Sequence, residues 1–354
     1  MMYIGLDVHA RTFAMVVVNG RGEEVFARQA QTSCESLREA VGMIAGRKRV
    51  VLEESTLADW VYRLLKGCAE EVVVAEPWHN RLIGKDEKLD DLKAARKLAR
   101  LLRSGDIHPV HHTDELERQV FKELVGLYYD AVKETTRCKS RLKAKFEQHG
   151  VQCSGRELYH ADRREQWAKR LESAGVCYQV ELLWEALDQA QERRARLHAR
   201  LRRQALTFEP IRRFMAVPGV GVIRAATFFA IVDTPHRFAS RSRLWSYCGI
   251  GLARRTSGQT SQPPHLTRHG NPRLKNVAKG AALTAITAGD NPFATQYEGL
   301  RAGGLAVEKA RLTVSRSLVA TLWAMWRKGV EYHPRQEGDP LPWPTSPPRR
   351  RRAA

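Results

Sequence analysis

Short apolar runs separated by turn residues dominate the N-terminal part of the chain. The runs at 2–7 and 12–18 are long enough for buried strands, and the turn Asn19-Gly20-Arg21-Gly22 leads into a third run. Between later runs, apolar residues recur at the three- and four-residue steps of a helix. The pattern predicts strands at 2–7, 12–18, 24–28, 49–53 and 72–74, and helices at 34–45 and 57–65.

Helical periodicity then takes over. A helix rich in Leu, Ala, Lys and Arg is predicted at 90–103, and Thr113-Asp114-Glu115 is expected to cap a long helix that follows. A second long helical pattern runs over about 162–205, beyond a turn at 149–160. Two long helices joined by such a turn predict an antiparallel helical arm. Such an arm is compatible with dimerisation and equally with a monomeric hairpin.

The last part of the chain is mostly helical but is interrupted twice. Pro218-Gly219-Val220-Gly221 stands inside a helix-Gly-x-Gly-helix pattern, which presents backbone N–H groups to a phosphate or simply connects two helices. Residues 253–271 are expected to be loop-like, and helices are predicted at 272–288 and 306–328. The Pro-rich tail with Arg349-Arg350-Arg351-Arg352 is expected to be disordered.

These elements predict an α/β domain followed by all-α parts. The order β-β-β-α-β-α-β, with an antiparallel meander first, is that of a ribonuclease H-like fold, although the order alone also allows a different α/β sheet. We expect an α/β domain at 1–110, a helical coiled-coil arm at 111–207, a C-terminal domain at 208–335 and a basic tail at 336–354.

The charge balance narrows the class of partner. The chain of 354 residues has 59 Lys and Arg against 39 Asp and Glu, a formal net charge of +20. A clustered excess of this size favours a polyanionic partner, because binding releases counterions from phosphates. The six cysteines are widely spaced and form no CxxC pair, so neither structural zinc nor a disulfide framework is expected. No apolar run reaches the roughly 18 residues of a membrane helix, and we expect a cytoplasmic protein without membrane contact.

Acidic residues follow apolar strands in two places. Asp7 ends the first predicted strand, Glu53 ends a strand expected beside it, and Asp90 and Asp91 open the helix at 90–103. Carboxylates on rigid elements hold the Mg²⁺ or Mn²⁺ ions of phosphoryl-transfer sites. Glu53 is preferred to Glu54 because alternation along a strand lets only one of them face Asp7. Asp7 on its own is also compatible with a turn or capping role.

A serine stands in a strongly basic segment near the C-terminal helices. Ser257-Gly258 is surrounded by polar and basic residues suited to phosphate: Arg254, Arg255, Arg268, His269, Asn271, Arg273 and Lys275. A serine hydroxyl is a weak nucleophile that needs an activating base or metal, and cations to stabilise the charge on phosphate. Local sequence leaves two readings open, a nucleophile or a serine in a flexible basic loop, with Ser261 as the next candidate nucleophile.

Both halves of the chain together resemble the DEDD-type transposases of bacterial insertion sequences, the group that includes the Piv-like DNA invertases. The resemblance extends from residue 2 to about 330. The segments that carry it are Tyr3–His9, Val50–Glu53, Arg96–Leu102, Val217–Gly221, Phe238, Trp245–Gly249, Ser257–Gly258 and His269–Asn271. Their order along the chain matches that of the family, and no single segment would suffice.

The resemblance implies a RuvC-like domain, a coiled-coil arm and a C-terminal domain with a catalytic serine. It implies a DNA transposase or recombinase that acts through a serine–DNA covalent intermediate, with Mg²⁺ or Mn²⁺ at the acidic site. The partners implied are donor and target DNA, a structured guide RNA encoded by the element, and other copies of the chain in a dimer or tetramer. The catalytic residues implied are Asp7, Glu53, Asp91 and Ser257, with Asp90 as a further metal ligand; Gly219 and Gly221 join the basic residues above as nucleic-acid contacts.

One position departs from the family pattern. The third acid falls on Asp91, but the fourth falls on Ala94, which cannot bind metal. Asp90 or Glu87, within one helical turn of Asp91, is expected to compensate. The alternative is a nucleic-acid-binding protein with a degenerate site. A further alternative is a RuvC-like structure-selective nuclease in which Ser257 only contacts phosphate.

Overall fold

The computed structural model describes residues 1–77, 90–253, 256–257, 260–261, 265–266 and 270–334. The chain divides into two compact units, Met1–Glu115 and Leu116–Ala354, which are described one at a time. In the described part of the chain, no helix is both long enough and apolar enough to cross a membrane. The expected disordered tail at 336–354, like Glu87, lies outside the described residues.

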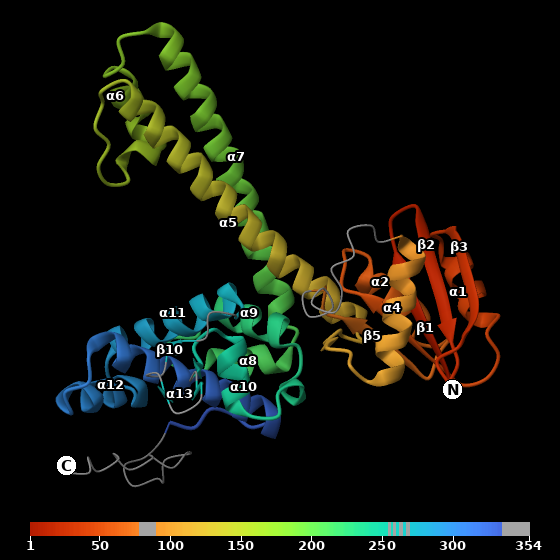
Figure 1. Ribbon diagram of the computed structural model, residues 1–354. Helices are drawn as coiled ribbons and strands as arrows, with labels where there is room; N and C mark the ends of the chain where they lie inside the picture. The colour runs from red at the N-terminus through yellow and green to blue at the C-terminus, as the bar shows by residue number, and fades with distance from the viewer. Residues whose placement is uncertain (78–89, 254–255, 258–259, 262–264, 267–269, 335–354) are drawn as a thin grey trace. The chain divides into compact units, whose positions relative to one another are not determined.

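The first unit is a mixed α/β sheet domain, as the sequence predicted (Figure 1). Its elements are β1 (Met2–Val8), β2 (Thr12–Val18), β3 (Glu24–Gln31), α1 (Cys34–Gly42), β4 (Lys48–Glu53), α2 (Ala58–Leu65), β5 (Glu71–Ala75), α4 (Asp91–Ser104) and β6 (Pro109–Val110). The strand order is β3-β2-β1-β4-β5-β6. β2 pairs antiparallel with β1 and β3, whereas β4 pairs parallel with β1 and β5. The sheet therefore opens with the predicted antiparallel meander.

The two faces of this sheet are covered by different helices. Ile4 and Leu6 of β1 point to the face packed by α1 and α2, with Leu37 and Val61 in the same core. Alternation turns Gly5 and Asp7 to the other face, which α4 covers. A Cβ atom on Gly5 would lie 2.0 Å from the Ala95 carbonyl oxygen, so the backbones of β1 and α4 are in direct contact there. This close approach sets where α4 begins relative to the end of β1.

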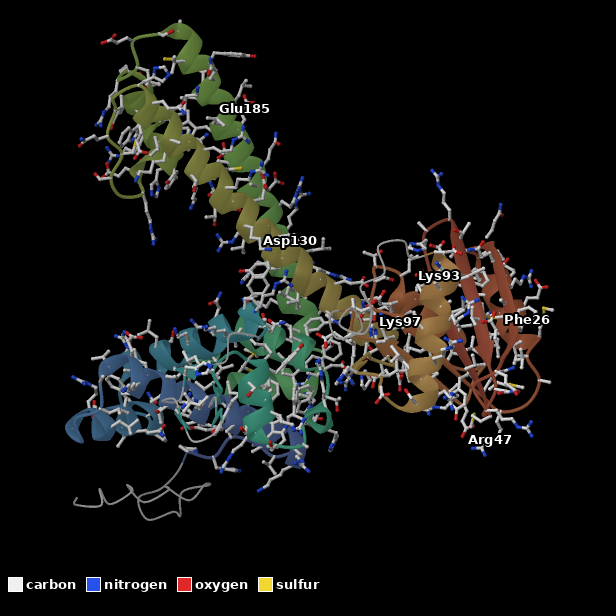
Figure 2. All side chains as sticks on the ribbon, viewed as in Figure 1. Phe26, Arg47, Lys93, Lys97, Asp130 and Glu185 are labelled. Atoms are coloured by element: carbon white, nitrogen blue, oxygen red, sulfur yellow. The ribbon has the colours of Figure 1, made fainter. Side chains whose placement is uncertain are left out.

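In the second unit, α5 (Leu116–Gln148) and α7 (Ala174–Ala205) pack against each other along their length (Figure 1). They are antiparallel, because Tyr128 lies beside His198 near one end and Phe146 beside Trp184 near the other. Charged residues occupy the outside of the pair, for example Asp130 on α5 and Glu185 on α7 (Figure 2).

The prediction of one continuous helix over 162–205 was wrong. The structure has a short helix, α6 (Arg164–Ala168), preceded by two 3₁₀ turns and followed by a break before α7. Trp167 packs edge-on against Phe146, and Leu171 is buried in the same small core. The chain breaks its helix because folding back buries these side chains, whereas a straight helix would leave them on the outside.

The remainder of the second unit is helical. Its helices are α8 (Glu209–Met215), α9 (Val222–Val232), α10 (Arg241–Tyr247), α11 (Pro272–Ala288), α12 (Pro292–Ala302) and α13 (Val307–Lys328). Their shared core is rich in Phe, Leu and Ala and includes Phe121 and Leu201 from α5 and α7. The sequence reasoning missed α12, although Asn291 caps it and Pro292 occupies its first position, which is a typical start signal.

The segment expected to be a loop at 253–271 contains short strands. β7 (Leu252–Ala253) pairs with β10 (His265–Leu266), and β8 (Thr256–Ser257) pairs with β9 (Thr260–Ser261). Both pairs are antiparallel, and the second lies within the first along the chain. We call residues 252–266 the serine hairpin. Threonines favour extended backbone, which the absence of long apolar runs concealed in the sequence.

Candidate active site

Asp7 and Asp91, far apart in the sequence, come together where β1 ends and α4 begins. Their nearest neighbour is a histidine that the sequence reasoning did not select. His9 Nε2 lies 3.4 Å from Asp7 Oδ1 and 3.7 Å from Asp91 Oδ1. One ligand atom from each of the three residues lies within 4.8 Å of the other two. The signal for His9 was its spacing, because residues two apart on an extended segment point to the same side.

The electrostatics of this group favour a cation. Burial raises the pKa of the Asp7 carboxyl; His9 opposes that shift and the negative charge of Asp91 adds to it. The charged form of Asp7 is therefore disfavoured unless positive charge is supplied nearby. Two carboxylates and an imidazole are a donor set that divalent cations accept in proteins. The residues present thus fit a divalent metal ion.

Glu53 lies on the same face of the sheet as Asp7. The parallel register pairs Leu6 with Leu52, and Val51 packs against the helix α4 side, so alternation turns Glu53 toward that side as well. Glu53 does not join the three-residue group among the described residues. Asp90 is exposed at the N-cap position of α4, with extended backbone and no capping bond from its side chain. Ala94, one turn into α4, is partly buried.

The neighbouring Glu54 is engaged elsewhere. Its carboxylate lies 2.7 Å from His112 Nε2, while His112 Nδ1 lies 2.5 Å from Asp59 Oδ1. The His112 side chain is only 4% exposed. Burial lowers its pKa, but the hydrogen bonds to Asp59 and Glu54 outweigh burial and raise the pKa to about 9. His112 is therefore a buried imidazolium that ties the end of β4 to α2, and it holds Glu54 away from the Asp7 group.

Ser257 lies at the end of β8, next to the connection between the two strands of the inner pair. Its register partner is Thr260, and Ser261 pairs with Thr256. Arg254, Arg255, Arg268 and His269, which were predicted to meet phosphate charge, lie outside the described residues. The structure therefore defines the backbone setting of Ser257.

The base of the serine hairpin is held by close backbone contacts. A Cβ atom on Gly270 would lie 2.5 Å from Gly249 Cα, so the chain entering the hairpin touches the chain leaving it. Arg316 of α13 donates a 2.7 Å hydrogen bond from Nε to the Ile250 carbonyl, and the Trp245 indole donates a 3.0 Å bond to the Arg316 carbonyl. Burial lowers the pKa of Arg316. No motif or spacing in the sequence pointed to this contact between Arg316 and Ile250.

Three of the predicted nucleic-acid contacts lie at the start of α11, and the structure shows what each side chain touches there. Asn271 caps the helix, because its Oδ1 accepts hydrogen bonds from the backbone N–H groups of Arg273 and Leu274 at 3.0 and 3.1 Å. The Arg273 guanidinium stacks 5.1 Å from the Tyr129 ring centre and lies 3.7 Å from Asp130. Lys275 is half-buried beside Gly249. Arg273 and Lys275 are both partly exposed, and their expected contact with phosphate stays a prediction.

The two glycines of the helix-Gly-x-Gly-helix pattern differ in what they do. Gly219 has a φ of +81°, and its Cβ would lie 2.2 Å from the Ala281 carbonyl oxygen, so it is needed for tight packing against α11. Gly221 precedes α9 with open space around it. A pocket of about 430 Å³ adjoins Gly221 and is lined by Tyr129, Arg224 and Asn276 among others. Only Gly221 therefore lies at a helix start that faces open space.

Comparison with known proteins places transposase segments in both units. Residues 4–150 match a family model described as Transposase, of the DEDD type of IS110. Residues 211–298 match the model described as Transposase IS116/IS110/IS902 family. Two segments of the chain are therefore similar to domains of IS110/IS116 transposases, and they follow the order that the resemblance of the sequence implied.

Several relatives are insertion-element proteins. The y4qE protein of Sinorhizobium fredii, named as a transposase, is 25% identical over 80% of this chain and 71% of its own length. A 43.6 kDa protein of insertion element IS110 from Streptomyces coelicolor is 32% identical over 34% of this chain and 29% of its own length. A 44.8 kDa protein of IS116 from Streptomyces clavuligerus is 32% identical over 32% of this chain. The match spans only 28% of that last relative.

Proposed function

We propose that the chain is the transposase of an IS110-family insertion sequence, a DNA recombinase that cuts and rejoins DNA strands. The observation that carries this proposal is the meeting of Asp7 and Asp91 in one acidic group, inside the segment that matches the DEDD-type transposase model. The order of both family segments along the chain supports it.

The sheet supports a ribonuclease H-like, RuvC-like assignment of the first unit. Its order β3-β2-β1-β4-β5, with only β2 antiparallel within that set, puts the end of β1 in the middle of the sheet. A carboxylate at the end of a central buried strand is held rigidly, as metal-assisted phosphoryl transfer requires. Asp7 occupies that position.

Asp7 and Asp91 would hold Mg²⁺ or Mn²⁺, with Glu53 and Asp90 as the other acids within reach of the same end of the sheet. A bound ion would stabilise the charge that develops on the scissile phosphate and on the attacking and leaving oxygens. The chain contributes fixed positions for the ligands: Asp7 through β1 and Asp91 through the contact of α4 with Gly5.

Ser257 is the proposed nucleophile. A bond would form between its Oγ and the DNA phosphorus as a bond from phosphorus to a sugar oxygen breaks. The freed DNA end leaves with that oxygen, and a DNA hydroxyl later displaces the serine. This exchange conserves one phosphodiester bond at each step, so it needs no nucleotide hydrolysis. Ser257 lies on the short β8 strand, and the basic residues that surround it in the sequence would meet the phosphate charge.

Nucleic acid accounts for the charge of the chain. Beyond donor and target DNA, the proposed partners are a structured guide RNA and further copies of the chain in a dimer or tetramer. The C-terminal part of α7 carries a run of exposed arginines: Arg193, Arg194, Arg196, Arg200, Arg202 and Arg203. Such a row binds phosphates without reading sequence. The guide RNA is tested by expressing the full chain together with its insertion element, purifying the protein and sequencing the RNA bound to it.

A specific observation favours a second function. Ala94 stands on α4 where the family pattern has its fourth acid, which fits a nucleic-acid-binding protein with a degenerate site. Strand exchange separates the two proposals. The full chain, incubated with element DNA, its RNA and Mg²⁺ or Mn²⁺, should yield rejoined strands. Binding without any cleavage in either metal would instead support the degenerate site, and cleavage without rejoining would support a nuclease.

A further inference from the structure

His9 is placed as if it belonged to the metal site. It follows the last residue of β1, and its Nε2 points to the carboxylates of both Asp7 and Asp91, at 3.4 and 3.7 Å. Ligands that share one small cation lie about 3 Å apart, because each bond to the metal is about 2.0–2.3 Å long. The observed spacings need only a small inward movement to reach that arrangement.

The backbone of His9 is fixed while its side chain is accessible. Its N–H donates to the Thr12 carbonyl at 2.9 Å, and its carbonyl accepts a 2.8 Å bond from Thr32 Oγ1. These bonds hold the connection between β1 and β2. The side chain is 57% exposed, so solvent and a cation can reach the ring. The chain therefore presents the imidazole from a rigid support toward the two acids.

Among the described residues, the group itself holds only two acids, Asp7 and Asp91. Ala94 offers no ligand from α4, and Glu53 does not join the group among the described residues. We propose that His9 is a third metal ligand beside Asp7 and Asp91, in a group to which Ala94 can add none, and that it shifts the preference of the site from Mg²⁺ toward Mn²⁺. This inference rests on the proposed function, because it assigns a ligand to the same site.

The shift in preference follows from the donor chemistry. Mg²⁺ prefers oxygen ligands in a strict octahedral arrangement and keeps several waters, whereas imidazole suits transition metals. Replacing a carboxylate with a neutral nitrogen also removes a negative charge, which weakens Mg²⁺ more than Mn²⁺. Without a metal, the His9 ring would only contact the carboxylates of Asp7 and Asp91, and the experiment must separate these roles.

Mn²⁺ binding to the full-length protein separates them. Electron spin echo spectra of bound Mn²⁺ should show coupling to ¹⁴N, and protein grown with ¹⁵N-histidine should change that coupling. In His9→Asn the coupling should vanish and the Mn²⁺ Kd should rise about tenfold or more. His149→Asn, at an exposed position in the second unit, is the matched control and should bind as the wild type does.

A double variant gives a further test. Combining His9→Asn with Ala94→Asp exchanges the imidazole for a carboxylate, so the affinity for Mg²⁺ relative to Mn²⁺ should rise. A wild-type spectrum without nitrogen coupling, or an unchanged Kd in His9→Asn, would overturn the role of His9. If Asp7→Asn also binds Mn²⁺ as tightly as the wild type, the acidic site itself fails, and the proposed function loses its metal. If only Asp7→Asn loses the ion, the proposed function stands and His9 is not a ligand.

Discussion

The acidic group and the serine hairpin are supported in different ways. Asp7 lies near the end of a central strand in which Ile4 and Leu6 are fully buried, and the α4 backbone rests directly on β1 at Gly5. Ser257 lies on a two-residue strand, and its hairpin is held where the chain enters and leaves, by Gly249, Gly270 and Arg316. In the proposed function, Asp7 needs exact spacing to the other metal ligands, which a packed sheet provides. The proposed nucleophile Ser257 needs a hairpin whose base is held in place.

The comparison predicts that the largest loss of activity comes from the metal ligands. Asp7→Asn keeps the shape of the side chain but removes its charge, so strand exchange should fall by about a thousandfold or more, while the thermal midpoint should stay close to that of the wild type. Recombination of element plasmids, read by quantitative amplification of the junction, measures the loss. Full activity in this variant would show that the acidic group has no catalytic role.

The next largest effect should come from the contact below the acidic group. In Gly5→Ala the new methyl would lie 2.0 Å from the Ala95 carbonyl oxygen, so α4 must move. We expect a loss of about 3 kcal/mol in the free energy of unfolding, together with weaker Mn²⁺ binding. Gly42→Ala, at a helix position with open space, is the control and should be neutral or slightly stabilising. Equal urea midpoints for the two variants would contradict the direct contact between β1 and α4.

The corresponding change in the serine hairpin should separate the two regions. Gly270→Ala would place a methyl 2.5 Å from Gly249 Cα and spread the hairpin base. Strand exchange should fall by about tenfold to a hundredfold, whereas Mn²⁺ affinity should not change. Gly299→Ala in α12, where a methyl meets nothing within 4 Å, is the control. If Gly270→Ala weakens Mn²⁺ binding as much as strand exchange, the acidic group and the serine hairpin are not held in place independently.

The smallest expected effect is on stability and comes from His112, whose ring bonds Glu54 after β4 and Asp59 of α2. The pKa of His112 is raised from 6.5 to about 9 in the folded protein, so its contribution to stability is complete below about pH 6.5 and disappears as the pH rises through 9. His112→Gln should therefore cost about 2 kcal/mol at about pH 6 and distinctly less at about pH 10. Urea unfolding of both proteins at the two pH values measures the difference. A cost that grows with pH would contradict a charged His112.

Apolar periodicity predicted the order of the strands and helices in the first unit and the long helix α5, because each of these depends on local spacing, but it missed the break between α6 and α7. Carboxylates that follow buried strands or open helices stand out, which marked Asp7, Glu53, Asp90 and Asp91; the resemblance then singled out Asp91. The contact of Gly5 with Ala95, the anchor from Arg316 and the place of His9 depend on residues distant in sequence, which local pattern cannot pair. The capping of α11 by the Asn271 side-chain oxygen was not foreseen, and its expected contact with nucleic acid stays a prediction.

The central claim is strand exchange through a serine–DNA bond, and one measurement tests it most directly. The full chain with its RNA should be incubated with radiolabelled element DNA, denatured in detergent and separated on a gel. We predict a labelled protein–DNA adduct for the wild type and none for Ser257→Ala, although that variant still binds RNA and DNA. An adduct of undiminished yield in Ser257→Ala would contradict the account and move the nucleophile elsewhere, with Ser261 the first residue to examine.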